Sequence, residues 1–260
     1  MSSTEALFAT DGPLAFLTFN RPQARNALTW AMYDTLVAAC DRVDGDSAVR
    51  VFVLRAAGDA FAAGTDISQF TGFASGDDGI AYERRLDAVI DRLERVSVPT
   101  IAQVDGVAAG GGCAIALACD LRVCTPAARF GVPIARTLGN CLSAANLARL
   151  VDLVGPARTK DLLFTGRFLD VQEAFALGLV TTIAERDGID AVVRELAGRL
   201  ATNAPLTIRA TKEAVRRIAA HRRVAASLAD DLISACYASA DFREGIEAFL
   251  AKRTPRFTGR

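Results

Sequence analysis

The stretch that decides the fold is Asp105-Gly106-Val107-Ala108-Ala109-Gly110-Gly111-Gly112-Cys113, which runs into the apolar Ala114-Ile115-Ala116-Leu117. It follows residues 100–104, whose apolar composition predicts a buried strand. Glycines allow a backbone to approach a ligand closely, and the start of a helix presents unpaired N–H groups with a partial positive charge. The stretch therefore has two interpretations, a platform of hydrogen-bond donors or a tight turn required by close packing.

A second glycine-bearing loop, Phe61-Ala62-Ala63-Gly64-Thr65-Asp66, also follows a predicted strand, at residues 49–55. Together the two loops could direct two backbone N–H groups at one oxygen that becomes negative during a reaction. The glycine spacing is not that of a dinucleotide site, and the chain has no GxxxxGK[ST] motif. A nucleophile elbow with a serine–histidine pair is also absent from the sequence.

Outward from these loops, predicted strands alternate with predicted helices. Further strands are expected at 14–19 and 121–124, and helices from Thr29 onward and over 80–96. From about residue 143 the pattern is mostly helical, with helices expected at 170–177, 187–201, 206–219 and 224–237, and from Asp241. This order predicts an α/β fold, one compact unit with a helical C-terminal region.

Composition limits the partners. The 260 residues contain 30 basic and 30 acidic side chains, so net charge indicates neither nucleic acid nor an anionic membrane as a partner. The first residues contain no apolar run long enough for a signal peptide, so we expect none, and the other apolar runs are too short to span a membrane. Six cysteines have no zinc-like spacing with the single histidine, His221, so we expect no metal, reduced thiols and a cytoplasmic protein.

Several motifs, in this order, cover nearly the whole chain, and with them the sequence resembles the enoyl-CoA hydratase/isomerase (crotonase) superfamily. The motifs are Asn20-Arg21-Pro22, Arg25-Asn26-Ala27-Leu28, Phe61-Ala62-Ala63-Gly64-Thr65-Asp66-Ile67, Val107-Ala108-Ala109-Gly110-Gly111-Gly112-Cys113, Ala118-Cys119-Asp120-Leu121-Arg122, Ala128-Arg129-Phe130-Gly131, residues 150–155, residues 162–166, Glu173-Ala174 with Gly178-Leu179-Val180, and Gly245-Ile246-Glu247-Ala248-Phe249-Leu250-Ala251-Lys252-Arg253.

The resemblance implies a crotonase-like spiral of ββα units. Residues 1–200 would form the core with a groove for coenzyme A (CoA), and residues 201–260 a helical region that mediates a homotrimer or a hexamer. The substrate would be an acyl-CoA thioester, so CoA would enter with the substrate and no separate cofactor is expected.

By the same resemblance, the thioester carbonyl binds between the backbone N–H groups of Thr65 and Gly111. These donors would stabilise an enolate-like oxygen, with an expected contribution of about 3 kcal/mol per donor in a dry site. Arg25, Lys252 and Arg253 are candidates for the CoA phosphates, or else surface charges. The resemblance and the loop composition predict these substrate contacts: Arg25, Ala27, Ala63, Asp66, Ile67, Gly110, Ile134, Asn140 and Lys252.

The chain departs from the hydratase pattern at its acidic positions. Ala114 and Ile134 stand where hydratases of the family carry glutamates, and Ser143 replaces an acid used by some isomerases and dehalogenases. Hydration needs one group to activate water and another to protonate carbon, which alanine and isoleucine cannot do. Decarboxylation of a malonyl-type thioester needs no carboxylate base, because loss of CO2 itself creates the enolate.

Three alternatives remain open from the sequence. The protein could be a hydratase or isomerase with a relocated acid, a malonyl-type acyl-CoA decarboxylase, or a catalytically silent acyl-CoA-binding protein. A purely structural subunit is a remote fourth. Turnover of an acyl-CoA distinguishes the enzymes from the silent binder.

Candidate replacements for the missing acids each have a simpler interpretation. Glu83 and Asp87 are predicted to lie on the solvated face of a helix, and Asp66 to cap its loop. Asn140 and Ser143 could hold a substrate carboxylate or water, or could pack their loop. Two further residues have weak signals: Arg136 could pair with an anionic acyl group, and His221 is expected at the surface.

Overall fold

The protein is described by a computed structural model that covers residues 4–222 and 225–260. Its larger sheet has six strands in the spatial order β1-β2-β3-β5-β7-β10. Neighbouring strands run parallel except for the β1–β2 hairpin. The strands are β1 (Ala6–Asp11), β2 (Leu14–Phe19), β3 (Val51–Ala56), β5 (Thr100–Val104), β7 (Leu121–Cys124) and β10 (Thr182–Ile183).

A second sheet has four short strands in the order β4-β6-β8-β9. They are β4 (Ala60–Ala62), β6 (Val107–Ala109), β8 (Arg129–Gly131) and β9 (Leu169–Asp170). The chain alternates between the sheets, since β3, β5 and β7 of the first are followed by β4, β6 and β8 of the second. A helix follows each pair, so the predicted spiral of ββα units is confirmed.

The helices follow the predicted order with some shifted ends. The α-helices are α1 (Trp30–Gly45), α2 (Gly76–Glu94), α3 (Gly111–Ala118), α4 (Ile134–Thr137), α5 (Ala144–Thr165), α6 (Val171–Ala176), α7 (Ile189–Thr202), α8 (Pro205–Arg222), α9 (Asp230–Tyr237) and α10 (Ala240–Leu250). The 3₁₀ helices are η1 (Pro22–Ala24), η2 (Ile67–Phe70) and η3 (Ala226–Ala229).

Side-chain caps explain where several helices begin. Thr29 caps α1 as predicted, and its side-chain oxygen accepts a hydrogen bond from Met32 N–H. Two predicted starts were wrong. Ser239, not Asp241, caps α10, because its hydroxyl accepts from the N–H of Phe242. The helix expected over 224–237 begins at Asp230 after η3, and Val224 lies outside the described residues.

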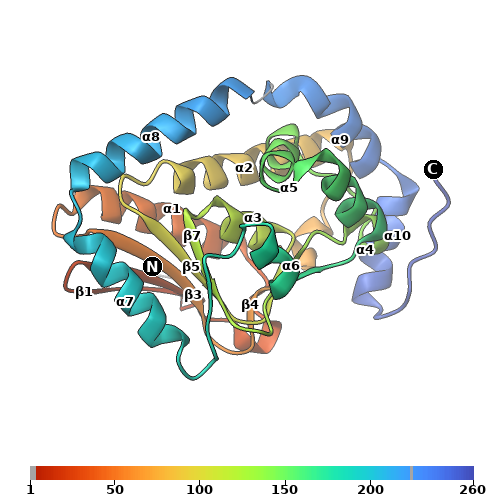
Figure 1. Ribbon diagram of the computed structural model, residues 1–260. Helices are drawn as coiled ribbons and strands as arrows, with labels where there is room; N and C mark the ends of the chain where they lie inside the picture. Colours follow the sequence, from red (N-terminus) through yellow and green to blue (C-terminus); the bar gives the residue numbers. More distant parts are fainter. Residues whose placement is uncertain (1–3, 223–224) are drawn as a thin grey trace. The chain divides into compact units, whose positions relative to one another are not determined.

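The core of the larger sheet is a layer of apolar side chains beneath α7. Figure 1 shows α7 lying across one face of this sheet. Phe16, Val53, Ile101 and Val123 from four strands pack against Ile189, Val193 and Ala197 of α7. These strands are nearly continuous apolar runs, which is the composition that a parallel sheet covered on its faces requires. Burial of each such side chain contributes about 1.5–3 kcal/mol to folding.

Contacts divide the chain into two compact units, here called the sheet unit and the helical unit, and each is described by itself. The sheet unit is Met1–Gly64, Val89–Phe130 and Leu169–His221, and the helical unit is Thr65–Ala88, Gly131–Phe168 and Arg222–Arg260. The expected boundary near residue 200 and the trimerisation role of 201–260 stay predictions. Over the described ranges, each helix is too short or too polar to cross a lipid bilayer.

Candidate active site

Two segments predicted to line the CoA groove are joined through their main chains in the sheet unit. Ala63 N–H donates to Arg25 O at 3.0 Å, and Leu28 N–H donates to Gly64 O at 2.7 Å. Arg25 has a left-handed backbone (φ 49°) and an exposed side chain, and Ala27 beside it is partly buried. The predicted groove segments therefore form one ladder of peptide groups.

The buried amide of Asn26 holds this ladder in place, a role that the sequence did not reveal. Its Oδ1 accepts from Arg21 N–H at 2.7 Å, and its Nδ2 donates to the carbonyls of Ala57 and Ala60, both at 2.8 Å. Its φ of 54° is left-handed, a conformation that asparagine tolerates better than most residues. The one available signal was an asparagine within the motif at residues 25–28.

The two glycine loops lie against each other in the sheet unit. A Cβ atom at Gly110 would stand 3.6 Å from the Cα of Gly64, and one at Gly112 only 2.5 Å from the Cβ of Ala62. Gly64 and Gly110 both have positive φ angles, 106° and 48°. The glycine run therefore serves close packing, as one interpretation predicted. The same packing places two stretches of backbone side by side, which the other interpretation, a platform of donors, also requires.

Helix α3 begins at this junction. Its N-cap residue Gly110 has no side chain to accept the first N–H groups, and the first turn closes with Ala114 N–H donating to Gly110 O at 3.0 Å. Gly111 is the first helical residue and is buried, and its N–H belongs to the turn that carries the positive end of the helix dipole. Thr65, the other predicted donor, follows Gly64 directly in the chain.

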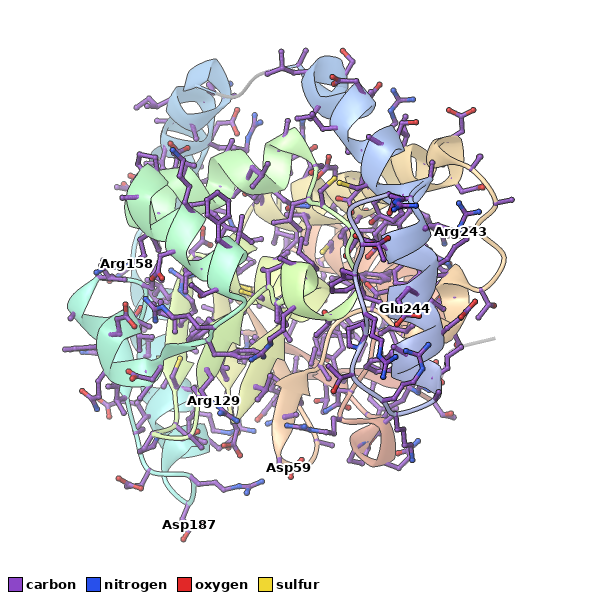
Figure 2. The ribbon with its side chains drawn as sticks, turned by 90° about the vertical axis from the view of Figure 1, so that its right-hand side faces the viewer. Asp59, Arg129, Arg158, Asp187, Arg243 and Glu244 are labelled. Atoms are coloured by element: carbon purple, nitrogen blue, oxygen red, sulfur yellow. The ribbon has the colours of Figure 1, made fainter. Side chains whose placement is uncertain are left out.

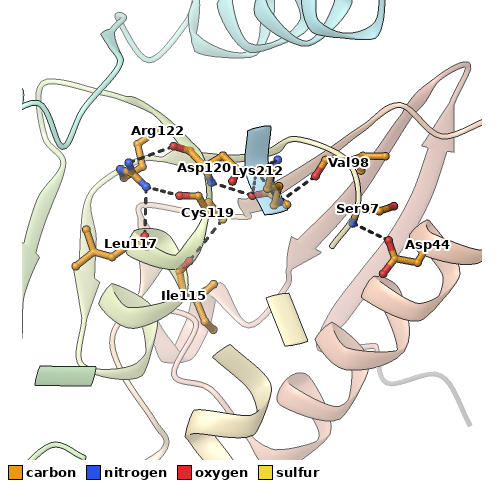
Figure 3. A network of polar contacts seen from close by, with 10 residues as sticks. Asp44, Ser97, Val98, Ile115, Leu117, Cys119, Asp120, Arg122 and Lys212 are labelled. Atoms are coloured by element: carbon orange, nitrogen blue, oxygen red, sulfur yellow. Dashed lines mark hydrogen bonds and ion pairs between the residues drawn. The ribbon is translucent and has the colours of Figure 1, made fainter. Parts of the chain in front are cut away.

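The opposite end of α3 is held by the buried guanidinium of Arg122 (Figure 3). It donates to the carbonyls of Ala116 at 3.2 Å, Cys119 at 2.6 Å and Asp120 at 3.4 Å, and its Nε–H donates to Leu179 O. A cation at a helix C-terminus neutralises the negative end of the dipole. The sequence presented this residue only as part of a motif.

Asp120 connects α8 to the same region of the sheet unit. One carboxylate oxygen accepts from Thr100 N–H at 2.7 Å, Thr100 Oγ1 at 2.9 Å and Lys212 Nζ at 2.7 Å. Lys212 also donates to Val98 O at 3.0 Å (Figure 3). These bonds attach the long helix α8 to the start of β5.

In the helical unit, the loop after Gly64 is fixed by its own side chains. Asp66 caps η2 by accepting from Ser68 N–H at 3.1 Å, so the predicted capping role is confirmed. Ile67 is the first residue of η2. The Thr65 hydroxyl lies 2.8 Å from Tyr82 Oη, which ties the predicted donor residue to α2.

Glu83 corrects a prediction. The sequence favoured a solvated side chain, yet Glu83 is only 1% exposed. Tyr237 Oη donates to its Oε1 at 2.7 Å, and Ser143 N–H donates to its Oε2 at 2.9 Å. The side of α2 that carries Glu83 is covered in the helical unit by α9 and by the loop before α5. Gly79 lies there too, where a Cβ would stand 2.2 Å from the Tyr237 ring.

Ser143 and Asp87 extend this cluster. The Ser143 hydroxyl caps α5, accepting from Asn146 N–H at 3.1 Å, and donates to Asp87 Oδ1 at 2.7 Å. Arg149 lies 3.7 Å from the same carboxylate. Asp87 was therefore also wrongly predicted as a merely solvated charge, and Ser143 packs its loop.

Burial raises the pKa of the Glu83 carboxyl from 4.5 to about 7, although the bonds from Tyr237 and Ser143 act in the opposite direction. The folded protein thus holds a proton that an unfolded glutamate releases near pH 4.5. Between these values the free energy of unfolding falls as pH rises, by about 1.4 kcal/mol per pH unit. We expect urea unfolding at pH 5 and pH 8 to show this loss, and Glu83→Gln to abolish it. An equal loss in the variant would contradict the assignment.

The predicted substrate contacts nearer the C-terminus are in the helical unit. Ile134 begins α4 and is partly buried, and Asn140 Nδ2 donates to Tyr237 Oη at 3.0 Å. Lys252 is exposed at a left-handed turn after α10. Arg253 is bound by Glu244 of α10 through two bonds of 2.6 and 2.8 Å, so its role toward phosphate stays a prediction. Figure 2 labels Glu244 on this helix.

Two weaker candidates gain no support. Arg136 is exposed on α4, and no contact of its side chain with an anionic group is seen among the described residues. The side chain of His221 lies outside what the structure describes.

Comparison with known proteins identifies the family. Residues 10–260 match the sequence profile described as Enoyl-CoA hydratase/isomerase. The chain belongs to the enoyl-CoA hydratase/isomerase family. The resemblance predicted from the motifs is thereby confirmed, and with it an enzyme family that acts on acyl-CoA thioesters.

Relatives in this family match over most or all of their length. The chain is 34% identical to 2,3-dehydroadipyl-CoA hydratase of Escherichia coli K12, covering 99% of this chain and 100% of that protein. It is 31% identical to the short-chain-enoyl-CoA hydratase of Clostridium acetobutylicum, with 97% of each chain covered.

Solved structures of the family share the fold. Methylmalonyl-CoA decarboxylase in complex with 2-nitronate-propionyl-CoA superimposes with a TM-score of 0.90 at 26% identity, over 99% of each chain. An enoyl-CoA hydratase/carnithine racemase from Magnetospirillum magneticum gives a TM-score of 0.80 at 33% identity, over 100% of this chain and 97% of the other.

Proposed function

We propose that this protein decarboxylates a malonyl-type acyl-CoA thioester and works by stabilising the thioester enolate between the backbone N–H groups of Thr65 and Gly111. The observation that carries the proposal is that Gly111 begins α3 at a glycine N-cap, while Ala114 and Ile134 stand at the two acid positions of the hydratases. Neither side chain can take up or deliver a proton.

The proposed reaction uses what the chain retains. The bond between the α-carbon and the carboxylate breaks, CO2 leaves, and the electron pair moves onto the thioester oxygen as an enolate. A proton then adds to the α-carbon to give the saturated thioester. The two N–H donors would act on the oxygen where charge develops, and removal of such a donor typically costs about 10²–10³ in rate.

Similarity of fold supports this choice within the family. The methylmalonyl-CoA decarboxylase complex has a TM-score of 0.90 to this chain, compared with 0.80 for the hydratase/racemase of higher sequence identity. The backbone thus agrees better with this decarboxylase than with this hydratase/racemase, although the sequence is more similar to the latter.

The proposal also covers the oligomeric state, the cellular location and the cofactor requirement of the protein. We propose a homotrimer or hexamer, supported by exposed apolar side chains on α8 at Leu206, Val215 and Ile218. A cytoplasmic location is supported by cysteines that are all free thiols. CoA would arrive as part of the substrate, with no additional cofactor.

The test is turnover by the unmodified protein of malonyl-CoA, methylmalonyl-CoA and crotonyl-CoA, followed by mass spectrometry. We expect loss of CO2 from at least one malonyl-type thioester and no addition of water to crotonyl-CoA. Rapid hydration would overturn the proposal and assign an acid elsewhere in the chain. Binding of all three thioesters without chemical change would instead identify a silent acyl-CoA-binding protein.

A further inference from the structure

The amide of Asn140 contains an unusual atom. Its Oδ1 is buried and is without a hydrogen-bond partner among the described residues, while its Nδ2 donates to Tyr237 Oη at 3.0 Å. A buried acceptor left unpaired costs about 1–3 kcal/mol, so the amide is held in this orientation at a cost and the orientation needs a cause. Asn140 was also singled out from the sequence as a possible holder of a substrate carboxylate.

The orientation of this amide follows from a chain of hydrogen bonds that ends at Glu83. An ionised carboxylate only accepts, so Tyr237 must donate its single proton to Glu83 Oε1. Tyr237 Oη can then only accept from Asn140, which must therefore turn its NH2 group toward the phenol. The charge on Glu83 thus decides that Asn140 leaves its carbonyl oxygen free.

Protonation of Glu83 reverses the direction of each hydrogen bond between Glu83, Tyr237 and Asn140. The carboxyl now donates to Tyr237 Oη, and the phenol proton becomes available to Asn140. The amide then turns its carbonyl oxygen toward the phenol and leaves its NH2 group free. A free NH2 group binds a carboxylate, whereas a free carbonyl oxygen repels one.

We propose that Glu83 is a positioning residue which, through Tyr237, turns the Asn140 amide so that an acyl group bearing a carboxylate is bound only while Glu83 is protonated. The inference rests on the proposed function, because it assigns recognition of the malonyl carboxylate to Asn140. It goes further by making that recognition depend on Glu83, a residue at neither of the two lost acid positions.

The connection with the predicted donor Thr65 lies within the helical unit. Thr65 is bonded to Tyr82, and the rings of Tyr82 and Tyr237 lie 6.1 Å apart. Phe242 packs on the Tyr237 ring at 4.7 Å. The relay therefore belongs to one packed aromatic cluster that also holds the loop beginning at Thr65.

The charged and titratable groups around Glu83 place its titration in a physiological range. Asp87 on the same helix repels the negative charge of Glu83 and is itself close to Arg149. Tyr237 of α9 and Cys141 of the loop before α5 also interact with Glu83. Burial is the main cause of the raised pKa of about 7. The switch would accordingly operate between pH 6 and pH 8.

The experiment measures binding of malonyl-CoA and acetyl-CoA to the full chain between pH 6 and pH 8, with KM for any thioester that turns over. The malonyl carboxylate is ionised throughout this range. We expect malonyl-CoA to bind about ten-fold more weakly at pH 8 than at pH 6, and acetyl-CoA to bind equally at both.

Three variants separate the relay from a merely structural role. Glu83→Gln donates to Tyr237 and accepts from Ser143 as the protonated acid would, so it should keep the tight binding of malonyl-CoA at pH 8. Tyr237→Phe interrupts the relay and should remove the pH dependence. Asp77→Asn, an exposed acid in the first turn of the same helix, should behave like the unmodified protein.

The outcomes are distinct from those of the proposed function. Turnover of malonyl-CoA with binding that does not change with pH, or a pH response unaltered in both Glu83→Gln and Tyr237→Phe, would overturn the relay and leave decarboxylation standing. The expected pH response without any turnover would retain the relay and reject decarboxylation. If Glu83→Gln does not fold, Tyr237→Phe alone decides.

Discussion

Gly111→Pro is expected to lower kcat by about 10²–10³, the loss typical of removing one donor to a developing oxyanion. Proline lacks the N–H group that Gly111 is proposed to direct at the enolate oxygen. The substitution suits this position, because Gly111 is the first residue of α3 and proline is favoured at the first turn of a helix. The measurement is turnover of the malonyl-type thioester that the unmodified protein consumes.

Gly111→Ala is the matched control. It adds a side chain at the same position but retains the N–H group, so its kcat should exceed that of the proline variant by most of the expected factor. Circular dichroism and thermal melting of both variants would establish that α3 is intact. Full activity of a folded Gly111→Pro protein would remove this residue from the mechanism.

Arg122→Met is expected to cause the largest loss of stability among the substitutions considered, at least about 3 kcal/mol. The change leaves buried carbonyl groups at the end of α3 and at Leu179 without their donor. Each unpaired buried acceptor costs about 1–3 kcal/mol, and methionine fills the volume without replacing any bond. Urea unfolding followed by circular dichroism measures the effect.

Arg199→Met on α7 is the control, because that arginine is exposed and its replacement should change the free energy of unfolding by less than about 0.5 kcal/mol. If Arg122→Met lost no more than this control, the bonds at the end of α3 would have no net role in stability.

Much of the fold could be predicted because its signals are local. Leu14–Phe19 and Thr100–Val104 are apolar runs that form strands with the predicted bounds. Thr29 and Asp170 are followed by helical spacing, and each caps the helix that begins after it. Parallel strands buried on both faces can be recognised in a sequence because nearly all of their residues are hydrophobic.

The parts that could not be predicted depend on contacts between distant residues. Ala60–Ala62 and Val107–Ala109 are three-residue strands, too short for any periodicity to distinguish them from loops. Burial of Glu83 requires Tyr237, which is 154 positions away in the chain. The sequence contained one signal of this contact, the glycines Gly76 and Gly79. They share a face of α2 with Glu83, and their lack of side chains makes room for α9.

The ladder of peptide groups at Arg25, Leu28, Ala63 and Gly64 has a consequence for how such a protein changes over generations. Its hydrogen bonds join peptide groups only, so substitutions of reactive side chains elsewhere leave these bonds in place. Side chains at positions such as Ala114 and Ile134 can therefore change without disturbing this ladder. Overall sequence similarity then indicates a shared backbone, and only the few side chains projecting over that backbone indicate which reaction is catalysed.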